Sequence, residues 1–485
     1  METQDCDLIV IGAGPVGENV ADRAVAGGMR TVIVEEELVG GSCSYWACVP
    51  SKALLRPHAA LSAARAVAGA RGAAAGDLDV QAVLRRRDAS VGDWDDTGQA
   101  EWLESAGIDL VRGHGELTEP RRVRVAHADG TVTLLAATHA VAVCTGSAPR
   151  VPQELAGIRP WTSRDATSAH EVPASLAIVG GGVVACEMAT AYAGLGVRVT
   201  MIVRGGILGR VEPFAAEAVR DGLEALGVTM HMPATVTEAH RTAKSAVLTL
   251  DDGSRVITEQ VLAATGRVPA TSELGLENVG LVPGDWLTVD DTLRVEGADW
   301  LYAVGDVNHR ALLTHQGKYQ ARAAGDVIAA RAKGDAVDDW PWGAHVATAD
   351  HTAVPQVVFT EPEVASVGAT AEQAQRDGRS VRVLDVDLAR LAGAAARSDD
   401  YRGRARAVVD DDRGVLLGAT FTGSGVAEML QAATIAVVGE VPLHRLWHAV
   451  PVFPTLAEVW LRWLEEYGRD SALTSGLSGR SAARP

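Results

Sequence analysis

The sequence predicts an α/β protein built from two parallel-sheet units and a separate α+β domain that follows them. A buried-strand signal, a glycine-rich turn and a helical stretch occur in this order twice, beginning at residues 8 and 176. Patterns typical of β-hairpins replace them after about residue 355. The chain has 485 residues, which suits about three domains at roughly 150 residues each.

The first unit opens with an apolar run, typical of a strand buried on both faces, immediately before Gly12. Gly12, Gly14 and Gly17 allow a tight turn and the close approach of a pyrophosphate to the helix N-terminus, where amide groups and the helix dipole favour anions. A second strand at residues 31–35 ends in Glu35, at a distance suited to a ribose hydroxyl. The unit predicts a dinucleotide site; the alternative is a tight turn without a ligand.

The second unit repeats this pattern with Gly180, Gly182 and Ala185 in the turn and the start of the helix. Arg204 stands where the first unit has Glu35. A carboxylate there would repel a 2′-phosphate, whereas a guanidinium can bind it bidentately. The second unit is therefore predicted to bind NADPH in preference to NADH.

Two further residues complete the predicted NADPH site. Arg210 follows Arg204 across a glycine-containing stretch and could clamp the same phosphate from the other side. Gly266 lies after the last apolar run of the second unit. The alternative interpretation of the two arginines is that they are solvated surface residues.

The remaining patterns set the predicted domain boundaries. A buried-strand signal at residues 301–304 returns to the first sheet, so the first domain is expected to be discontinuous. Residues 57–107 predict helices, alternating signals around Gly130 predict a hairpin, and residues 405–409 and 415–419 predict another. The expected domains are a first nucleotide-binding domain at residues 1–155 and 280–345, a second at 156–279, an α+β domain at 346–467 and a flexible tail at 468–485.

Composition narrows the class of function. A net charge of −18 and a pI near 5.2 disfavour nucleic-acid and anionic-membrane partners, which an acidic surface would repel. The acidic start does not resemble a signal sequence, and the apolar run at residues 176–196 contains Glu187 and three glycines in a row, so neither secretion nor a membrane span is predicted. We expect a cytoplasmic protein with small-molecule ligands. Five cysteines are too few for a structural disulfide framework in so long a chain, and no metal site is predicted.

Cys43 and Cys48 lie five positions apart, directly after the first unit, and a disulfide between them is geometrically possible. Residues 40–52 resemble the Gly-Gly-x-Cys-x4-Cys-x-Pro-[Ser/Thr]-Lys signature of the FAD-dependent pyridine nucleotide-disulfide oxidoreductases. This family includes glutathione reductase, dihydrolipoamide dehydrogenase and mercuric reductase. The resemblance covers about residues 5–460. It includes the turn with Thr145 and Gly146, the second FAD motif at Gly305 and Asp306, and the start of the dimerisation domain at residues 358–363.

The resemblance implies two Rossmann-like domains, for FAD and NADPH, and a C-terminal α+β dimerisation domain that completes each active site of a homodimer across the interface. It also implies a redox-active disulfide in which Cys48 faces the flavin and Cys43 faces the substrate. In the family, NADPH passes a hydride to FAD, and the electrons then open the disulfide and reach an acceptor through the Cys43 thiolate.

Further residues match family positions around the flavin. Asp306 would bind its ribitol chain, and Lys52 and Glu187 match the family's ion pair beside the ring, where a cation stabilises the reduced anion. His315 resembles a position near the flavin; the alternative is a structural histidine with satisfied hydrogen bonds. The other three cysteines have apolar neighbours and receive no predicted chemistry.

The C-terminal segment departs from the family pattern His-Pro-Thr-x-x-Glu. Glu458 is retained, but Phe453 replaces the histidine that protonates the leaving thiolate. A proton donor must then come from elsewhere, with His448 and Tyr45 as candidates, or be unnecessary for the substrate. Mercuric reductases also lack this histidine, but they use a C-terminal cysteine pair, and this chain has no cysteine after Cys186.

Tyr45 and Trp46 are unusual between the two cysteines, where small or aliphatic residues are common in the family. They could shape an apolar substrate site or pack against the helix that carries Trp460 and Trp463. The predicted function is NADPH-linked reduction of a small acceptor, with a low-molecular-weight disulfide as the first choice. Metal-ion or quinone reduction is the second, and a degenerate flavoprotein acting as a redox sensor or binding scaffold is the third.

Overall fold

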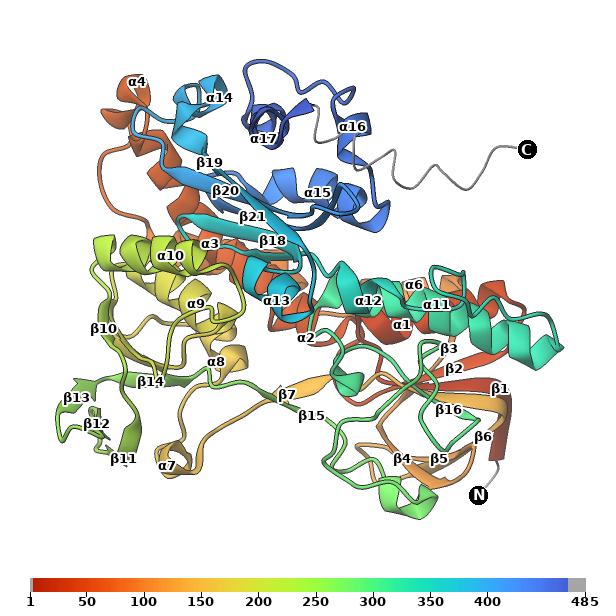
Figure 1. Cartoon of the computed structure of the whole chain (residues 1–485). Helices are drawn as coiled ribbons and strands as arrows, with labels where there is room; N and C mark the ends of the chain where they lie inside the picture. The colour runs from red at the N-terminus through yellow and green to blue at the C-terminus, as the bar shows by residue number, and fades with distance from the viewer. Residues whose placement is uncertain (1–2, 470–485) are drawn as a thin grey trace, which may run out of the picture.

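The structure, a computed structural model, describes residues 3–469, and its helices pack around three larger sheets and two smaller ones (Figure 1). The first sheet has the order β3-β2-β1-β6-β5-β4, and β16 pairs with the end of β6. Its β1, β2, β3, β6 and β16 run parallel to one another, whereas β4, β5 and β6 pair antiparallel in sequence order. The β5–β6 pair around Gly130 is the predicted hairpin. The strands are β1 (Thr3–Ile11), β2 (Thr31–Glu35), β3 (Asp109–Arg112), β4 (His114–Glu119), β5 (Arg122–Ala126), β6 (Val132–Val143) and β16 (Leu301–Ala303).

Two long helices cover one face of this sheet: α1 (Pro15–Ala26) and α11 (Thr314–Lys333) lie side by side in Figure 1. Pro15 suits the first position of α1, where no backbone N–H is needed. Arg23 on α1 binds Asp326 on α11 through two hydrogen bonds of 2.8 and 2.9 Å. The predicted return of the chain to the first sheet at residues 301–304 is thus observed, together with the helix that follows.

The predicted helical region starts earlier than expected, because α3 begins at Cys48 and contains Pro57. A proline inside a helix leaves the carbonyl four residues before it without its N–H partner. Here that carbonyl, on Ala53, accepts a hydrogen bond of 3.1 Å from Arg86 on another helix. The helices of this region are α2 (Gly41–Tyr45), α3 (Cys48–Arg65), α4 (Ala68–Arg71), α5 (Val80–Ser90) and α6 (Thr97–Ser105).

The second unit is a parallel sheet of order β10-β9-β8-β14 with an antiparallel β11-β12-β13 sheet beside it. Its buried helix α9 follows the second glycine turn, as predicted. The elements are α7 (Gln153–Ala156), α8 (Ser163–Ser168), β8 (Ser175–Val179), α9 (Val183–Gly194), β9 (Arg198–Ile202), α10 (Pro213–Ala225), β10 (Thr229–His231), β11 (Val236–Arg241), β12 (Ala246–Leu250), β13 (Arg255–Thr258) and β14 (Gln260–Ala263).

The chain passes between the first two units through an antiparallel ribbon of β7 (Ser147–Pro149) and β15 (Arg267–Pro269) (Figure 1). Beyond β15, Leu274 and Leu276 already pack in the core of the first unit. The chain therefore returns to the first unit before residue 274, earlier than the boundary expected at residue 280, because the ribbon itself is the connection.

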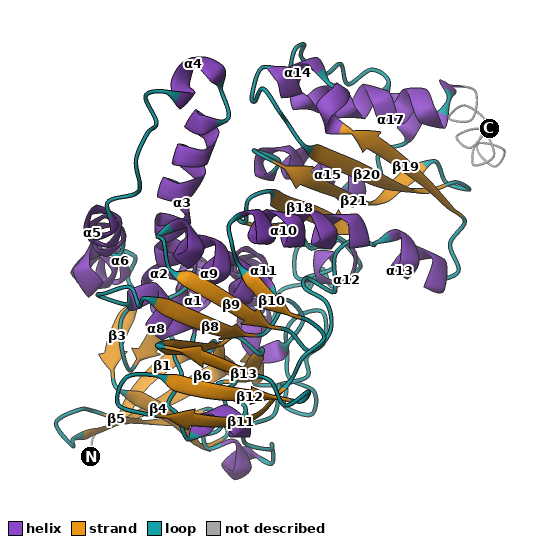
Figure 2. Ribbon diagram, turned by 90° about the vertical axis from the view of Figure 1, so that its left-hand side faces the viewer, coloured by secondary structure: helices purple, strands orange, loops and turns teal. Residues whose placement is uncertain are grey.

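The last domain is an antiparallel sheet of order β17-β18-β21-β20-β19. Helices α15 and α17 pack on it from one side, and α10 of the second unit contacts β18 and β21 from the other (Figure 2). The elements are α12 (Ala349–Thr352), β17 (Gln356–Val358), β18 (Glu363–Gly368), α13 (Ala371–Arg376), β19 (Val381–Asp387), α14 (Ala392–Ala395), β20 (Gly403–Asp410), β21 (Val415–Gly423), α15 (Leu430–Val438), α16 (Leu443–Leu446) and α17 (Val459–Tyr467).

Two sequence-based expectations concern the ends of the chain and its membrane topology. Most of the tail predicted at residues 468–485 lies outside the described residues. Within residues 3–469, no helix combines the length and the apolar character that crossing a bilayer would require.

Candidate active site

The first glycine turn packs directly against the segment that leads to the cysteine pair. Gly12 has φ of +100°, and a Cβ there would lie 2.6 Å from the Cys144 carbonyl oxygen. A Cβ on Gly17 would lie 1.9 Å from the carbonyl oxygen of Gly12, and one on Gly41 would lie 2.8 Å from the Cα of Gly14. Side chains are excluded at these positions, which explains why the sequence has glycines in both turns.

The surroundings of this turn fit a dinucleotide such as FAD. Glu35 ends β2, and its carboxylate accepts hydrogen bonds from the backbone N–H groups of Ala13 (2.7 Å) and Glu37 (2.9 Å). Burial raises the pKa of Glu35, and these two hydrogen bonds oppose that shift. The buried Thr145 hydroxyl has no hydrogen-bond partner within residues 3–469, and the space beside Gly146 is open. An unsatisfied hydroxyl beside an open space is consistent with a ligand that supplies the missing partner.

Asp306 follows β16 and the positive-φ residue Gly305. Its carboxylate accepts a 2.5 Å hydrogen bond from the Ser147 hydroxyl and lies 3.7 Å from the Arg267 guanidinium. Burial raises the pKa of Asp306, while Ser147 and Arg267 lower it. Arg267 and Ser147, on the ribbon between the units, are site residues that sequence reasoning missed; the only signal was their position next to Gly266 and Gly146.

Cys48 is the first residue of α3, and its thiol and that of Cys43 shift each other's pKa. The Cys48 Sγ lies 3.3 Å from the hydroxyl of Thr314, the first residue of α11. The Cys43 thiol, followed by Thr314 and Lys52, lowers the pKa of Cys48 to about 6, although burial opposes this. The pKa of Cys43 is raised, because its proton is held by Cys48 and because the thiol is buried. Thr314 was not predicted, since nothing in the sequence links it to a cysteine so far away.

The predicted ion pair is formed: the Lys52 Nζ lies 2.7 Å from a Glu187 oxygen. The other Glu187 oxygen accepts a 3.0 Å hydrogen bond from the backbone N–H of Phe359, and the Lys52 ammonium lies 4.8 Å from the centre of the Phe359 ring. The three residues come from the three domains, so this contact joins all of them beside the cysteine pair.

The second glycine turn leaves an open approach to the end of β9. Gly180 has φ of +134°, and a Cβ there would lie 2.1 Å from a backbone oxygen, whereas Gly182 and Gly266 face open space. Arg204 and Arg210 are both exposed, and neither makes an ion pair or hydrogen bond within residues 3–469. Ala185 is fully buried at the start of α9, where a larger side chain would separate helix and sheet.

Tyr45 and Trp46 pack within the nucleotide-binding part of the chain. Tyr45 is 1% exposed and its hydroxyl donates a 3.3 Å hydrogen bond to the Asp95 carbonyl oxygen. Burial raises the pKa of Tyr45 to about 12, which makes it a poor proton donor. The Trp46 ring stacks 3.6 Å from the Arg164 guanidinium, which also binds both carboxylate oxygens of Glu37. Both aromatic rings therefore pack on the nucleotide-binding domains, whereas Trp460 and Trp463 pack in the C-terminal domain.

His315 is exposed, and its Nε2 lies 2.8 Å from the Pro355 carbonyl oxygen. This contact joins the start of α11 to the segment that enters the C-terminal domain. The contact gives one ring nitrogen a hydrogen-bond partner, as expected for a structural histidine. The remaining cysteines, Cys6, Cys144 and Cys186, are buried, and burial raises the pKa of each thiol.

The segment between α16 and α17 projects from the C-terminal domain, far from α2 in both ribbon views (Figures 1 and 2). Its apolar side chains Val450, Val452 and Phe453 are 82%, 71% and 72% exposed, and His448 is exposed as well. Glu458, by contrast, is buried, and one of its oxygens has no hydrogen-bond partner within residues 3–469. Within the described part of one chain, the structure does not bring Phe453 or Glu458 to the cysteine pair.

Comparison with known proteins assigns the chain to the family that its cysteine motif resembles. Residues 6–327 match the family model described as pyridine nucleotide-disulphide oxidoreductase, and residues 354–463 match the dimerisation domain of the same family. The chain belongs to this family. It is an FAD-dependent oxidoreductase that uses a pyridine nucleotide and carries a dimerisation domain.

The relatives include enzymes with different acceptors. A dihydrolipoyl dehydrogenase of Haloferax volcanii is 32% identical over 93% of this chain and 94% of its own length. A mercuric reductase of Streptomyces lividans is 31% identical over 98% of both chains. Among solved structures, the flavoprotein disulfide reductase RclA of Escherichia coli, as a Cu(II) complex, has a TM-score of 0.82 at 22% identity and covers 96% of this chain and all of its own. This last likeness concerns the fold alone.

Proposed function

We propose that the protein passes electrons from NADPH through FAD and the Cys43–Cys48 pair to a low-molecular-weight disulfide. The observation that carries the proposal is the placement of Cys48 at the N-terminus of α3, with its Sγ 3.3 Å from the Thr314 hydroxyl. A helix N-terminus and hydrogen bonds to sulfur both stabilise a thiolate. FAD, held by the first glycine turn, Glu35, Thr145 and Asp306, supplies a two-electron carrier between the nicotinamide and the pair.

The two thiols divide the exchange chemistry between them. In the reduced pair the proton of Cys43 is directed at the Cys48 thiolate. Cys48 is therefore the base that accepts this proton when the Cys43 sulfur attacks the substrate. The Cys43 sulfur forms a bond to one sulfur of the substrate, and the first product thiolate leaves. Cys48 gives the proton it took from Cys43 to this first thiolate product and then attacks the Cys43 sulfur as a thiolate, the second thiolate leaves, and the Cys43–Cys48 disulfide forms. Two electrons pass from the pair to the substrate in each cycle.

The preference for NADPH is part of the proposal. Arg204 and Arg210 are exposed guanidinium groups without partners in the described part of the chain, near the end of β9. A free arginine keeps its five donors for a phosphate, whereas one already in an ion pair would have to exchange partners. This availability favours a site for the 2′-phosphate over a structural role.

A second copy of the chain would complete the site. The apolar segment of Val450, Val452 and Phe453 is exposed in one chain and belongs to the dimerisation domain. A surface patch of this kind is typical of a subunit interface. In the family arrangement, this segment would place Phe453 opposite the partner subunit's cysteine pair, so that an apolar ring stands where most relatives have a proton donor.

Metal-ion reduction is the second candidate, because two adjacent thiols are good ligands for soft metal ions and a mercuric reductase is among the relatives. The sequence has no cysteine after Cys186 to deliver a metal ion from a second site. A panel of disulfides, quinones and metal ions, with NADPH oxidation as the readout, separates the candidates. Turnover with disulfides that Cys43→Ser abolishes supports the proposal. Turnover only with metal ions or quinones replaces it, and tight nucleotide binding without any turnover would indicate a redox sensor.

A further inference from the structure

A buried carboxylate, Asp350, lies behind the turn that carries Asp306, and the chemistry described above does not use it. It belongs to α12, the short helix before the C-terminal domain, and its side chain is 1% exposed. Its two oxygens accept hydrogen bonds from the side-chain amides of Gln316 (2.7 Å) and Gln320 (2.9 Å) on α11. A carboxylate is costly to bury unless it is paired and hydrogen-bonded, so these contacts indicate a specific role.

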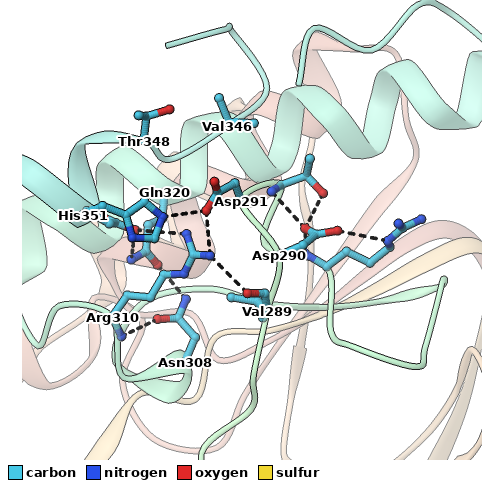
Figure 3. A network of polar contacts seen from close by, with 12 residues as sticks. Val289, Asp290, Asp291, Asn308, Arg310, Gln320, Val346, Thr348 and His351 are labelled. Atoms are coloured by element: carbon cyan, nitrogen blue, oxygen red, sulfur yellow. Dashed lines mark hydrogen bonds and ion pairs between the residues drawn. The ribbon is translucent and has the colours of Figure 1, made fainter. Parts of the chain in front are cut away.

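Gln320 connects this carboxylate to the turn. It is fully buried, and its Oε1 accepts hydrogen bonds from the Gly305 backbone N–H and from the Asn308 Nδ2, both of 2.8 Å. Figure 3 shows Gln320 and Asn308 together in this network. Both groups are donors, so the Gln320 amide must face them with its oxygen, and its NH2 group needs an acceptor on the other side. Asp350 is that acceptor.

We propose that Asp350 is a positioning residue for FAD binding, because it fixes the orientation of the Gln320 amide and thereby holds the Gly305–Asp306 turn in place. This inference rests on the proposed contact of Asp306 with FAD. An asparagine at position 350 would be nearly the same size, but its NH2 group would face an amide NH2 of either Gln316 or Gln320. If the Gln320 amide turned over to accept that hydrogen bond, its own NH2 would face the Gly305 N–H. A carboxylate satisfies both glutamines without either amide turning over.

A neighbouring contact provides a matched control. Asp291 accepts hydrogen bonds from Arg310 (2.9 Å) and from the His351 ring (2.7 Å), and Figure 3 shows these residues beside Gln320. His351 is on the same short helix as Asp350, but its side chain is 51% exposed and its ring binds Asp291 rather than Gln320. Substituting it disturbs the same segment without touching the amide that holds the turn.

The test is the affinity of the apoprotein for FAD, measured by flavin fluorescence, in Asp350→Asn, Gln320→Glu, the double variant and His351→Gln. Asp350→Asn removes the buried charge, which lies 3.8 Å from the Arg310 guanidinium, and one amide must turn over, so FAD binding should weaken about tenfold. Gln320→Glu should weaken it as well, because two carboxylates then face each other. In the double variant, the carboxylate at position 320 accepts from the Gly305 N–H and from the side-chain amide at position 350, so affinity should return to within about threefold of the wild type. His351→Gln should leave it unchanged.

The proposal is overturned if Asp350→Asn binds FAD as His351→Gln does, or if the double variant is as weak as its weaker parent. Should Asp350→Asn not accumulate as folded protein, the comparison of Gln320→Glu with the double variant decides in the same way. Asp306→Asn tests the contact on which the inference rests. Unchanged FAD affinity in Asp306→Asn would refute the role of Asp306. If Asp306→Asn loses FAD affinity while Asp350→Asn binds FAD normally, only the positioning role of Asp350 is refuted.

Discussion

Cys48 has three neighbours that stabilise its thiolate: Cys43, the Thr314 hydroxyl and the Lys52 ammonium. The position of the residue at the start of an 18-residue helix adds the favourable end of the helix dipole. Cys43 holds its proton more tightly, because the Cys48 thiolate and burial raise the pKa of Cys43 by more than Thr314 lowers it. The two sulfurs are therefore chemically distinct, which is what a pair with one flavin-facing and one substrate-facing thiol needs.

The first prediction follows from this difference. Anaerobic reduction with NADPH should produce a long-wavelength charge-transfer band from the Cys48 thiolate beside oxidised flavin. Cys48→Ser should abolish the band, and Cys43→Ser should keep or strengthen it, as absorbance spectra of the two variants will show. A band that survives in Cys48→Ser would reassign the flavin-facing thiol.

The second prediction concerns pH. The pKa of Cys48 is lowered to about 6, so the thiolate is present above that pH and protonated below it. The charge-transfer band should therefore fade as the pH falls through about 6. Thr314→Val removes a hydrogen bond that lowers the pKa and should shift the midpoint upwards, while Thr314→Ser should keep it. An unchanged midpoint in Thr314→Val would mean that the hydroxyl does not act on the thiolate.

The third prediction concerns coenzyme choice. A charge-assisted contact to the 2′-phosphate contributes about 1.5–3 kcal/mol, or roughly 10- to 150-fold in affinity. Arg204→Glu should lower the preference for NADPH over NADH by at least this factor, so that NADH is favoured. Arg210→Glu should have a smaller effect. The ratio of kcat/KM for the two coenzymes measures both. Arg198→Glu is the control, since Arg198 is exposed at the opposite end of β9. Equal coenzyme ratios in Arg204→Glu and Arg198→Glu would place the phosphate elsewhere.

At the scale of elements, local patterns predicted the strands before each glycine turn, the helix after each turn and the hairpins, because period and turn chemistry are encoded within a few residues. The long helix α11 after β16 was not predicted. The start of α3 was not predicted, because Pro57 is tolerated only through the hydrogen bond between Ala53 and the distant Arg86. The contacts of Cys48 with Thr314 and of Asp306 with Arg267 likewise join residues that are far apart in the sequence. A single sequence does not reveal such long-range contacts.

The segment between α16 and α17 supports a fourth prediction. A phenylalanine cannot donate a proton, so disulfides whose thiols are acidic should be reduced fastest, because their thiolates leave without protonation. Phe453→His should accelerate reduction of basic alkyl disulfides, provided that Glu458 can orient the ring; rates with a series of disulfides of graded thiol pKa measure this. If the wild type already reduces basic alkyl disulfides rapidly and His448→Ala loses that activity, a relocated acid replaces this explanation.

At the scale of the whole molecule, a single carboxylate joins the three domains. Glu187 comes from the second domain, is 5% exposed, and binds Lys52 of the first domain and the Phe359 N–H of the third. Removing Lys52 would lower the stability of the fold by more than the ion pair contributes, because the buried charge of Glu187 would lose its partner. The domains are thus held in one arrangement beside the cysteine pair.

A fifth prediction addresses the second copy of the chain. Replacing both Val450 and Val452 by Asp should shift the protein towards monomers in light scattering, because charges would be buried at an apolar contact. Acceptor turnover should fall while flavin reduction by NADPH in stopped-flow remains, since the residues proposed for that step lie within one chain. The exposed Ile257, on the second domain, is the control site for an Asp substitution. Full acceptor turnover by a monomer would show that the partner is dispensable.

The β7–β15 ribbon determines how the second domain joins the first. Pro149 and Arg267 are paired directly across the ribbon, so the chain leaves for the second domain and comes back at the same place. A short turn between these two residues could close the first domain without the second, and the second would keep its two ends adjacent. The second domain is therefore a single continuous insertion between two adjacent points of the first, and it leaves the first sheet on either side undisturbed.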